Sequence, residues 1–384
     1  MEEYILKKID NRFILWFKQS NQWISLEEPA WFVLQQYQKG IDLLTISGKL
    51  SKTYKLPQQE CQTFVNEICE GLLKFSHPDP SPVLGINNSF DLHRYSFQPY
   101  SVKQYQIGDK RIAINFETRR SEFYIHPQMA FLESKKTDET DLQFDIFENE
   151  AIPVLRETKT SVTVFTFEDY MQLKNQLYIQ LSNFLYHKTE QEWLSFVHAS
   201  AITDGKQTLL LSSGSGSGKS TMAALLQTKG LRLVSDDFVP IGVKTKKAFP
   251  FPAGLSVKDG AFDLLSPHYT DLRDPDLIHY KYQHYSVRYI PLPVNDVAYF
   301  RPRPVKTIVF IGYDPSVSCE LSQLPINESL RLFHEQAWIS RTPEHARIFI
   351  NWFVKLRCFR LEYGNTEEAI NTVMSLFESP KLYD

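Results

Sequence analysis

The sequence predicts a mixed α/β fold with more than one domain. Three observations support this prediction: a length of 384 residues, a globular composition with 42% hydrophobic and 23% charged residues, and apolar segments that alternate between strand-like and helix-like spacing. The 14% share of aromatic residues indicates aromatic-rich cores. We therefore expect a large α/β core, preceded by a small N-terminal domain and a β-rich middle segment.

The first 75 residues are predicted to form a hairpin followed by three helices. Two extended segments, 13–17 and 22–26, flank a turn-forming stretch, and helices are expected from Pro29, from Leu43 and after Pro57. This order, with Trp-Ile-Ser-Leu-Glu-Glu-Pro-Ala-Trp in the hairpin and the helix after it and Gly-Leu-Leu in the third helix, resembles the PqqD-like family of small winged-helix domains. The resemblance implies that residues 1–77 recognise a precursor peptide. A docking or dimerisation domain without a peptide ligand is the alternative, and the lack of a dense Arg/Lys face argues against DNA binding.

A domain boundary is predicted at residues 76–82, where three prolines stiffen the chain and forbid a helix. Strand-like segments follow at 111–116, 142–147 and 161–167, and a helix is expected from about Glu168. Residues 78–190 should therefore form a β-rich middle region that packs on the core. The leucine-lined helix carries no recognisable catalytic residue.

The strongest functional pattern lies at residues 208–222, where an apolar strand-like run leads into a glycine- and serine-rich segment and then a helix-like run. Glycines let successive N–H groups turn inward around a phosphate, Lys219 would reach the β- and γ-phosphates, and the Ser220 hydroxyl would bind Mg²⁺. ATP and Mg²⁺ are the expected ligands. The predicted nucleotide-binding residues are Gly214, Ser215, Gly216, Ser217, Gly218, Lys219, Ser220 and Thr221. Ser213 stands where the strict pattern has glycine, and a flexible linker is the alternative.

Three further side chains are expected beside this loop. A hairpin turn at Asp204-Gly205 would bring His198 back toward the start of the loop. Asp236 and Asp237 follow a short predicted strand, and in α/β sheets the carboxyl end of a strand faces the ligand. Because neighbouring strand residues point to opposite faces, one carboxylate can serve the acceptor and the other the metal. The alternatives are a structural histidine and an acidic pair that forms a turn or a helix cap.

His198, Gly218-Lys219-Ser220 and the segment 229–237, aligned without a gap over about 40 residues, resemble the core of the HPr kinase/phosphorylase family. These bacterial serine kinases are related to the phosphoenolpyruvate carboxykinase fold. The resemblance implies a P-loop kinase core over residues 191–384, with His198 near the transferred phosphate and Asp236 as the base toward the acceptor serine. Asp237 and Ser220 are then the expected ligands of Mg²⁺. The family's Glu-containing signature is not visible in residues 249–258, so a substrate other than HPr is expected.

A basic and aromatic stretch at residues 271–303 could supply a cation to the transferred phosphoryl group, and Arg288 is the predicted candidate. Single-stranded nucleic acid bound on its tyrosines is the alternative. The net charge of −3 gives no general attraction to nucleic acid or acidic membranes. A strand at 305–311, helices from Asn327 and Glu344 and a strand at 358–363 are expected to finish the core.

Together these patterns predict an ATP-dependent, serine/threonine-type phosphotransferase that acts on a peptide or protein, with a ribosomal peptide precursor as the candidate acceptor. A small-molecule kinase and a non-catalytic nucleotide-binding scaffold remain as alternatives. The first residues lack a signal-peptide pattern, and no apolar run reaches membrane-spanning length. We therefore expect a cytoplasmic protein with no nucleic-acid or membrane partner, for which a homo-oligomer is allowed.

Overall fold

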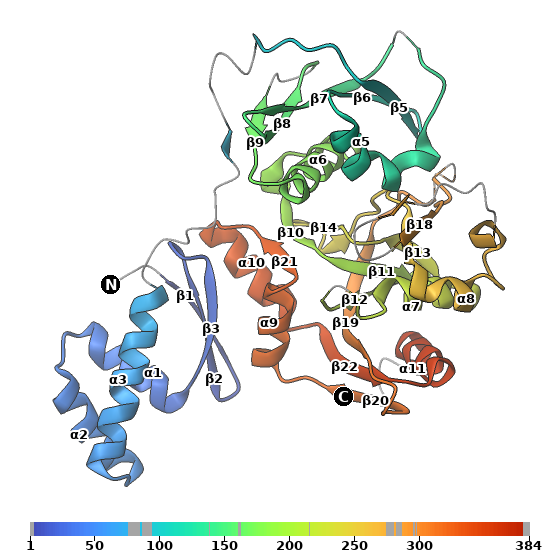
Figure 1. The fold of residues 1–384 in the computed structure, drawn as a ribbon. Coiled ribbons are helices and arrows are strands. Elements are labelled where there is room, and N and C mark those ends of the chain that lie inside the picture. Colours follow the sequence, from blue (N-terminus) through green and yellow to red (C-terminus); the bar gives the residue numbers. More distant parts are fainter. Residues whose placement is uncertain are drawn as a thin grey trace. The chain divides into compact units, whose positions relative to one another are not determined.

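The fold is described by a computed structural model, which covers residues 4–75, 85–86, 94–137, 139–159, 163–214, 216–273, 280–281, 286–294, 296 and 298–378. It is a mixed α/β protein with several sheets, as the sequence predicts (Figure 1). The chain divides into two compact units. The first comprises Met1–Ser81, Leu324–Glu335 and Ile339–Lys355, and the second comprises Pro82–Gln323, Gln336–Trp338 and Leu356–Asp384.

The first unit contains a three-stranded antiparallel sheet with the order β1-β2-β3. Its strands are β1 (Tyr4–Ile9), β2 (Arg12–Phe17) and β3 (Gln22–Glu27). Three helices follow: α1 (Glu28–Gln38), α2 (Leu43–Tyr54) and α3 (Gln58–Phe75). The predicted hairpin and the three predicted helices are confirmed, with Pro29 in the first turn of α1.

Every residue of β2 after Arg12 is buried. Since alternate residues of a strand point to opposite sides, both faces of β2 are covered. On one side it packs against α1 and α3, in a cluster of Phe13, Leu15, Phe17, Leu34 and Leu72. On the other side Trp16 packs with Ile5 and with Ala346 of α10 (Pro343–Phe353). Helix α9 (Ile326–His334) contacts β3 (Figure 1). Helices from both ends of the chain therefore cover this sheet.

The predicted helices from Asn327 and Glu344 are present, but they complete the first unit and not the C-terminal core that we expected. The apolar face of α10 explains this placement, since Phe349 packs on Trp23 with ring centroids 5.2 Å apart. The predicted domains 1–77, 78–190 and 191–384 do not coincide with the two units, and their boundaries stay predictions.

The second unit begins with a six-stranded sheet in the order β4-β9-β8-β7-β6-β5. Its strands are β4 (Gly85–Ile86), β5 (Ser101–Ile107), β6 (Lys110–Phe116), β7 (Leu142–Asn149), β8 (Ile152–Glu157) and β9 (Val164–Thr166). Helix α5 (Arg119–Ile125), the 3₁₀ helix η1 (His126–Leu132) and helix α6 (Tyr170–Leu185) accompany it. The predicted strands 111–116 and 142–147 are confirmed. Residues 161 and 162 of the third predicted strand lie outside the described residues.

The larger sheet of this unit has the order β13-β11-β12-β19-β15-β14-β10-β21, with β22 paired to β19 and β20 to β22. Its first strands are β10 (Trp193–Val197), β11 (Ala199–Thr203), β12 (Thr208–Ser212), β13 (Arg232–Ser235), β14 (Val239–Gly242) and β15 (Lys247–Ala248). Its last are β19 (Arg303–Tyr313), β20 (Cys319–Gln323), β21 (Ala337–Ile339) and β22 (Arg357–Tyr363). Strands β12, β19 and β22 are parallel, so their carboxyl ends lie at one edge.

The remaining elements of the second unit are shorter. Strands β16 (Leu255–Lys258), β17 (Tyr280–Lys281) and β18 (Ser286–Ile290) form a small sheet. The helices are α7 (Lys219–Thr228), α8 (Phe262–Leu265) and α11 (Thr366–Glu378), with the 3₁₀ helices η2 (Glu190–Glu192), η3 (Asp259–Ala261) and η4 (Thr270–Arg273).

Residues 195–203, before the turn at Asp204-Gly205, belong to two strands that meet at His198. Strand β10 pairs with β14, whereas β11 pairs with β12 and β13. The backbone N–H of His198 donates to the carbonyl oxygen of Gln336 at 2.7 Å, so the chain changes partners at this residue. The predicted hairpin register is confirmed, because Ala199 pairs with Ser212 and places His198 next to the loop.

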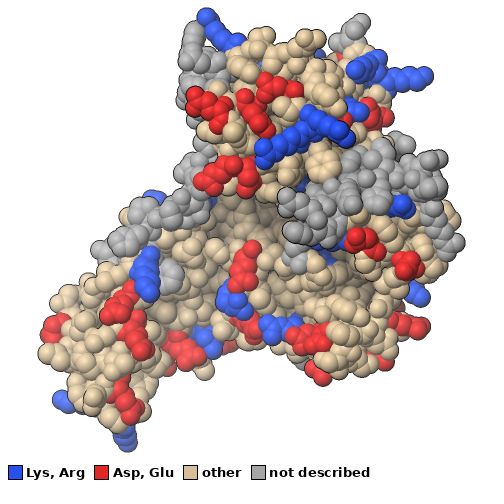
Figure 2. Space-filling model, in the orientation of Figure 1, with Lys and Arg blue, Asp and Glu red and all other residues tan. Residues whose placement is uncertain are grey.

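One buried apolar cluster extends from the middle sheet through α6 to the large sheet. The ring of Tyr178 in α6 lies 4.4 Å from that of Phe251 and 5.5 Å from that of Phe238, centroid to centroid. Helix α6 is therefore fixed against the segments that follow β13 and β15. None of the helices in the described ranges combines the length and apolar character needed to span a bilayer. Acidic and basic side chains are interspersed on the face in Figure 2.

Candidate active site

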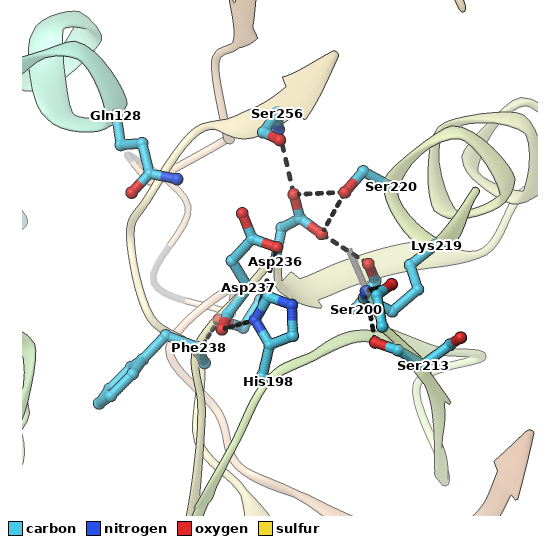
Figure 3. A network of polar contacts seen from close by, with 12 residues as sticks. Gln128, His198, Ser200, Ser213, Lys219, Ser220, Asp236, Asp237, Phe238 and Ser256 are labelled. Atoms are coloured by element: carbon cyan, nitrogen blue, oxygen red, sulfur yellow. Dashed lines mark hydrogen bonds and ion pairs between the residues drawn. The ribbon is translucent and has the colours of Figure 1, made fainter. Parts of the chain in front are cut away.

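The glycine-rich loop joins β12 to α7, as the sequence predicts. Gly216 and Gly218 have positive φ angles of 84° and 93°, which only glycine adopts without strain. The ammonium group of Lys219 donates to the backbone carbonyl oxygens of Ser213 and Gly214, at 2.8 and 2.9 Å (Figure 3). Lys219 is thus folded over the loop, where it can turn to a bound phosphate.

The loop also holds polar groups that lack partners. Within the described residues the buried hydroxyls of Ser212 and Ser217 have no hydrogen-bond partner. A buried polar group without a partner is costly, and a phosphate would supply the missing acceptor. Gly214 and Gly216 have open space where a Cβ would be. The predicted Ser215 lies outside the described residues, and Thr221 lies half-buried in the first turn of α7.

The carboxylate of Asp236 lies at the centre of a hydrogen-bond network (Figure 3). It accepts from the hydroxyl of Ser200 at 2.5 Å, from the backbone N–H of Ser256 at 3.0 Å, and from the hydroxyl of Ser220 at 3.0 Å to each oxygen. The residue is only 1% exposed. Burial, followed by the charge of Asp237, raises the pKa of Asp236 to about 7, although the three donors favour the ionised form.

Asp237 and His198 form the more open part of the site, with side chains 31% and 42% exposed. The Nδ1 atom of His198 lies 3.2 Å from the carbonyl oxygen of Asp237 and 3.9 Å from its carboxylate. Since a carbonyl oxygen only accepts, this contact places the imidazole proton on Nδ1 and leaves Nε2 as an acceptor in the neutral ring. Burial lowers the pKa of His198, against the opposing effect of Asp237. The φ angle of 63° at Asp237 turns the chain sharply here.

The sequence did not single out a group of three linked residues, of which Lys174 lies within electrostatic reach of Asp237. The hydroxyl of Tyr178 and the ammonium group of Lys174 both donate to the side-chain oxygen of Gln128, at 2.6 and 3.4 Å. Burial lowers the pKa of Lys174, whereas the charge of Asp237 raises it. The backbone oxygen of Gln128 accepts from the N–H of Gly254, next to the segment that contacts Asp236. The only sequence signal for this group was a lysine next to the leucine-lined face of the predicted helix.

Arg288 is engaged elsewhere. Its guanidinium donates to the backbone oxygen of Leu272 and lies 5.1 Å from the centre of the Phe262 ring. No contact among the described residues brings it to Asp236, Asp237 or the loop. Much of the basic and aromatic stretch, residues 274–279 and 282–285, lies outside the described residues.

No known family model and no curated protein matches this chain.

The residues at the loop fit a magnesium–nucleotide complex. No cluster of three His, Cys, Asp or Glu side chains that could hold a metal by itself occurs in the described ranges. Mg²⁺ at phosphate sites is usually held by one or two carboxylates together with phosphate and water oxygens, and the pair Ser220 and Asp236 provides such ligands. The hydroxyl of Ser217, which has no partner among the described residues, and the positive φ angles of the glycines favour an anion in the loop.

Proposed function

We propose that this chain is an ATP-dependent phosphotransferase that phosphorylates a serine or threonine hydroxyl of a peptide or protein, with Mg²⁺. The observation that carries this proposal is the direct contact of Ser220 with Asp236 beside a glycine-rich loop that follows a strand and opens a helix. The loop amides and Lys219 would hold the phosphates, and bound Mg²⁺ would offset their charge. The resemblance to the HPr kinase core supports the same assignment.

The contacts favour a division of labour between the two carboxylates. Asp236 is enclosed and shares its oxygens with Ser220, which suits a group on the metal side of the nucleotide. Asp237 is more exposed and lies beside His198, so it can reach an acceptor hydroxyl and take its proton. We therefore propose Asp236 for the metal and Asp237 for the base, the reverse of the sequence-based assignment, which stays the alternative.

Lys174 is our candidate for the cation that neutralises charge on the transferred phosphoryl group. Its only described hydrogen bond is a long one of 3.4 Å to an amide oxygen that Tyr178 already occupies. Such a weakly bonded ammonium, within electrostatic reach of Asp237 and His198, has donors to offer an anion. Arg288, the sequence-based candidate, is held by Leu272 and Phe262.

A peptide acceptor is supported by the first unit. A groove of about 480 Å³ there is lined by Phe17, Leu34, Tyr37, Gln38, Gly40, Leu72 and Leu73. In the described part of the chain β3 ends the sheet on one side, so an added strand could pair with it. The resemblance to PqqD-like domains supports recruitment of a precursor peptide here.

A transfer assay tests the proposal. Purified protein would be incubated with Mg²⁺ and ATP labelled on the γ-phosphate, together with either the peptide fraction or the small-molecule fraction of a lysate. We expect alkali-labile label, typical of phosphoserine and phosphothreonine, in the peptide fraction. Lys219→Ala should abolish it, and Lys229→Ala, at the exposed end of the same helix, should not.

The other outcomes identify the alternatives. Label confined to the small-molecule fraction would overturn the peptide acceptor in favour of a small-molecule kinase. Nucleotide binding without transfer to either fraction would favour a non-catalytic scaffold.

A further inference from the structure

Two tyrosines end the parallel strands beside the phosphate loop. Tyr313 is the last residue of β19 and Tyr363 the last residue of β22, and they pair directly in the register of these strands. Strand β19 also pairs with β12, whose last residue, Ser212, leads into the loop. Both rings therefore lie at the edge of the sheet where the loop lies.

Tyr363 contacts the loop itself. A Cβ atom built on Gly218 would lie 2.9 Å from the hydroxyl oxygen of Tyr363, closer than real side chains allow. The ring of Tyr363 is 4% exposed, whereas Tyr313 is 57% exposed. The two ring centroids are 5.6 Å apart with an interplanar angle of 74°. A buried ring therefore supports an exposed one next to the phosphate loop.

The turns that carry these tyrosines are tied together. The N–H of Asp314 donates to the carbonyl oxygen of Tyr363 at 2.9 Å, and the N–H of Gly364 donates to that of Val317 at 2.7 Å. Gly364 has no room for a side chain, because a Cβ atom there would lie 2.7 Å from the same oxygen of Val317. Tyr313 is thus an aromatic surface on a firmly held turn.

The sheet order gives the direction in which a nucleotide would lie. Asp236 follows β13, which lies on one side of β12, whereas β19 and β22 lie on the other side. A nucleotide whose terminal phosphate is near Asp236 would extend its base toward the opposite flank, outside the carboxyl ends of β19 and β22. That flank carries Tyr313.

We propose that Tyr313, supported by Tyr363, is the stacking surface for the base of a bound purine nucleotide. The proposal rests on the phosphotransferase function proposed above, because it takes the glycine-rich loop as the site of the phosphates. An exposed aromatic ring is suited to this task, since its face packs on the flat base without a specific set of hydrogen bonds.

The test compares two probes, Mg²⁺-ATP and Mg²⁺-tripolyphosphate, which has no base. Titration calorimetry would measure both for the wild type, Tyr313→Ala, Tyr313→Phe and the control Tyr100→Ala, another exposed tyrosine of the second unit. We expect Tyr313→Ala to weaken ATP binding by about tenfold or more and to leave tripolyphosphate binding unchanged. Tyr313→Phe and Tyr100→Ala should bind both probes like the wild type.

Two results would overturn the proposal alone: ATP binding that Tyr313→Ala does not change, or an equal loss of both probes, which would indicate a distorted loop. A wild-type protein that binds neither probe would remove the nucleotide site and the proposed function with it. The thermal stability of each variant checks its folding, and an exposed tyrosine should tolerate truncation.

Discussion

The hydroxyl of Ser220 lies 3.0 Å from each carboxylate oxygen of Asp236 and joins the first turn of α7 to the residue after β13. Asp237, the next residue, lies instead beside His198. Adjacent carboxylates in such different surroundings should respond differently to substitution.

Asp237→Asn should lower the rate of phosphoryl transfer by about 10²–10⁴-fold, the usual contribution of a general base, and should leave the affinity for Mg²⁺-ATP nearly unchanged. Asp236→Asn should instead raise the Mg²⁺ concentration needed for half-maximal rate. Initial rates over a range of Mg²⁺ and ATP concentrations measure both effects. The opposite pattern would restore Asp236 as the base.

Lys219→Ala should remove most of the stabilisation that Mg²⁺-ATP gives to the protein. Ligand at about a hundred times its dissociation constant contributes roughly 2.7 kcal/mol to the folded state, which melting curves detect readily. Lys219 supplies the formal positive charge of the loop, so the variant should show little shift. Lys229→Ala should keep the full shift, and an equal shift in both variants would contradict the assignment.

Lys174→Ala should reduce the transfer rate by about 10²–10³-fold, as expected for the loss of one donor to the developing charge. Lys174→Arg keeps the charge and should recover part of the rate. Single-turnover kinetics separates this effect from binding, since ATP affinity should change little. A rate in Lys174→Ala equal to the wild type would mean that another cation faces the phosphate.

Metal-free protein should lose stability as the pH rises from about 4 to about 7. Burial and Asp237 raise the pKa of Asp236 from 3.8 to about 7, so the folded state holds this proton more tightly than the unfolded chain does. The contribution of Asp236 to stability is therefore fully present below its pKa in the unfolded chain. It is lost as the pH rises through its pKa in the folded protein.

Asp236→Asn resembles the protonated acid and should match the wild type below about pH 4 but melt at a higher temperature at pH 8. A gain of about 1 kcal/mol corresponds to roughly 2–4 °C for a domain of about 200 residues. Melting curves in EDTA test this, with Asp109→Asn as an exposed control. Parallel pH profiles of wild type and Asp236→Asn would show that Asp236 is not the cause.

Leu73→Asp should raise the Michaelis constant for a peptide acceptor severalfold while leaving ATP binding intact, because the residue lines the groove yet is 50% exposed. Leu44→Asp, at an exposed leucine outside the groove, is the matched control. These two point substitutions test the groove more specifically than a deletion of residues 1–77 would, because the deletion would also expose the face of α10 that packs on Trp16. Equal Michaelis constants for Leu73→Asp and Leu44→Asp would show that the groove does not recruit the peptide acceptor.

Local features of the fold could be predicted because they depend on neighbours in sequence. The turn after β2, Pro29 at the start of α1 and the glycines of the loop each act over a few residues. The placement of Lys174 depends instead on α6 packing against Phe238 and Phe251, which no periodic pattern encodes. The break at His198 likewise depends on a hydrogen bond to Gln336, more than a hundred residues away in sequence.

The sequence does contain a sign that the second face of β2 is buried. A strand with one solvent-exposed face alternates between apolar and polar residues, whereas the segment Phe-Ile-Leu-Trp-Phe at 13–17 is apolar throughout. This run indicates a strand buried on both faces. The sequence could not indicate that α9 and α10 cover this face, because an apolar face can pack on any other apolar surface and does not specify its partner.

The cover that α10 gives to Trp16 has a consequence for biosynthesis. A ribosome makes residues 4–75 first, yet the outer face of their sheet stays bare until residue 353 has emerged. At about 5–20 residues per second, this interval lasts roughly 14–60 seconds. During that time a nascent chain exposes Trp16 and Ile5 to other proteins, so a chaperone that shields this face should raise the yield of folded protein.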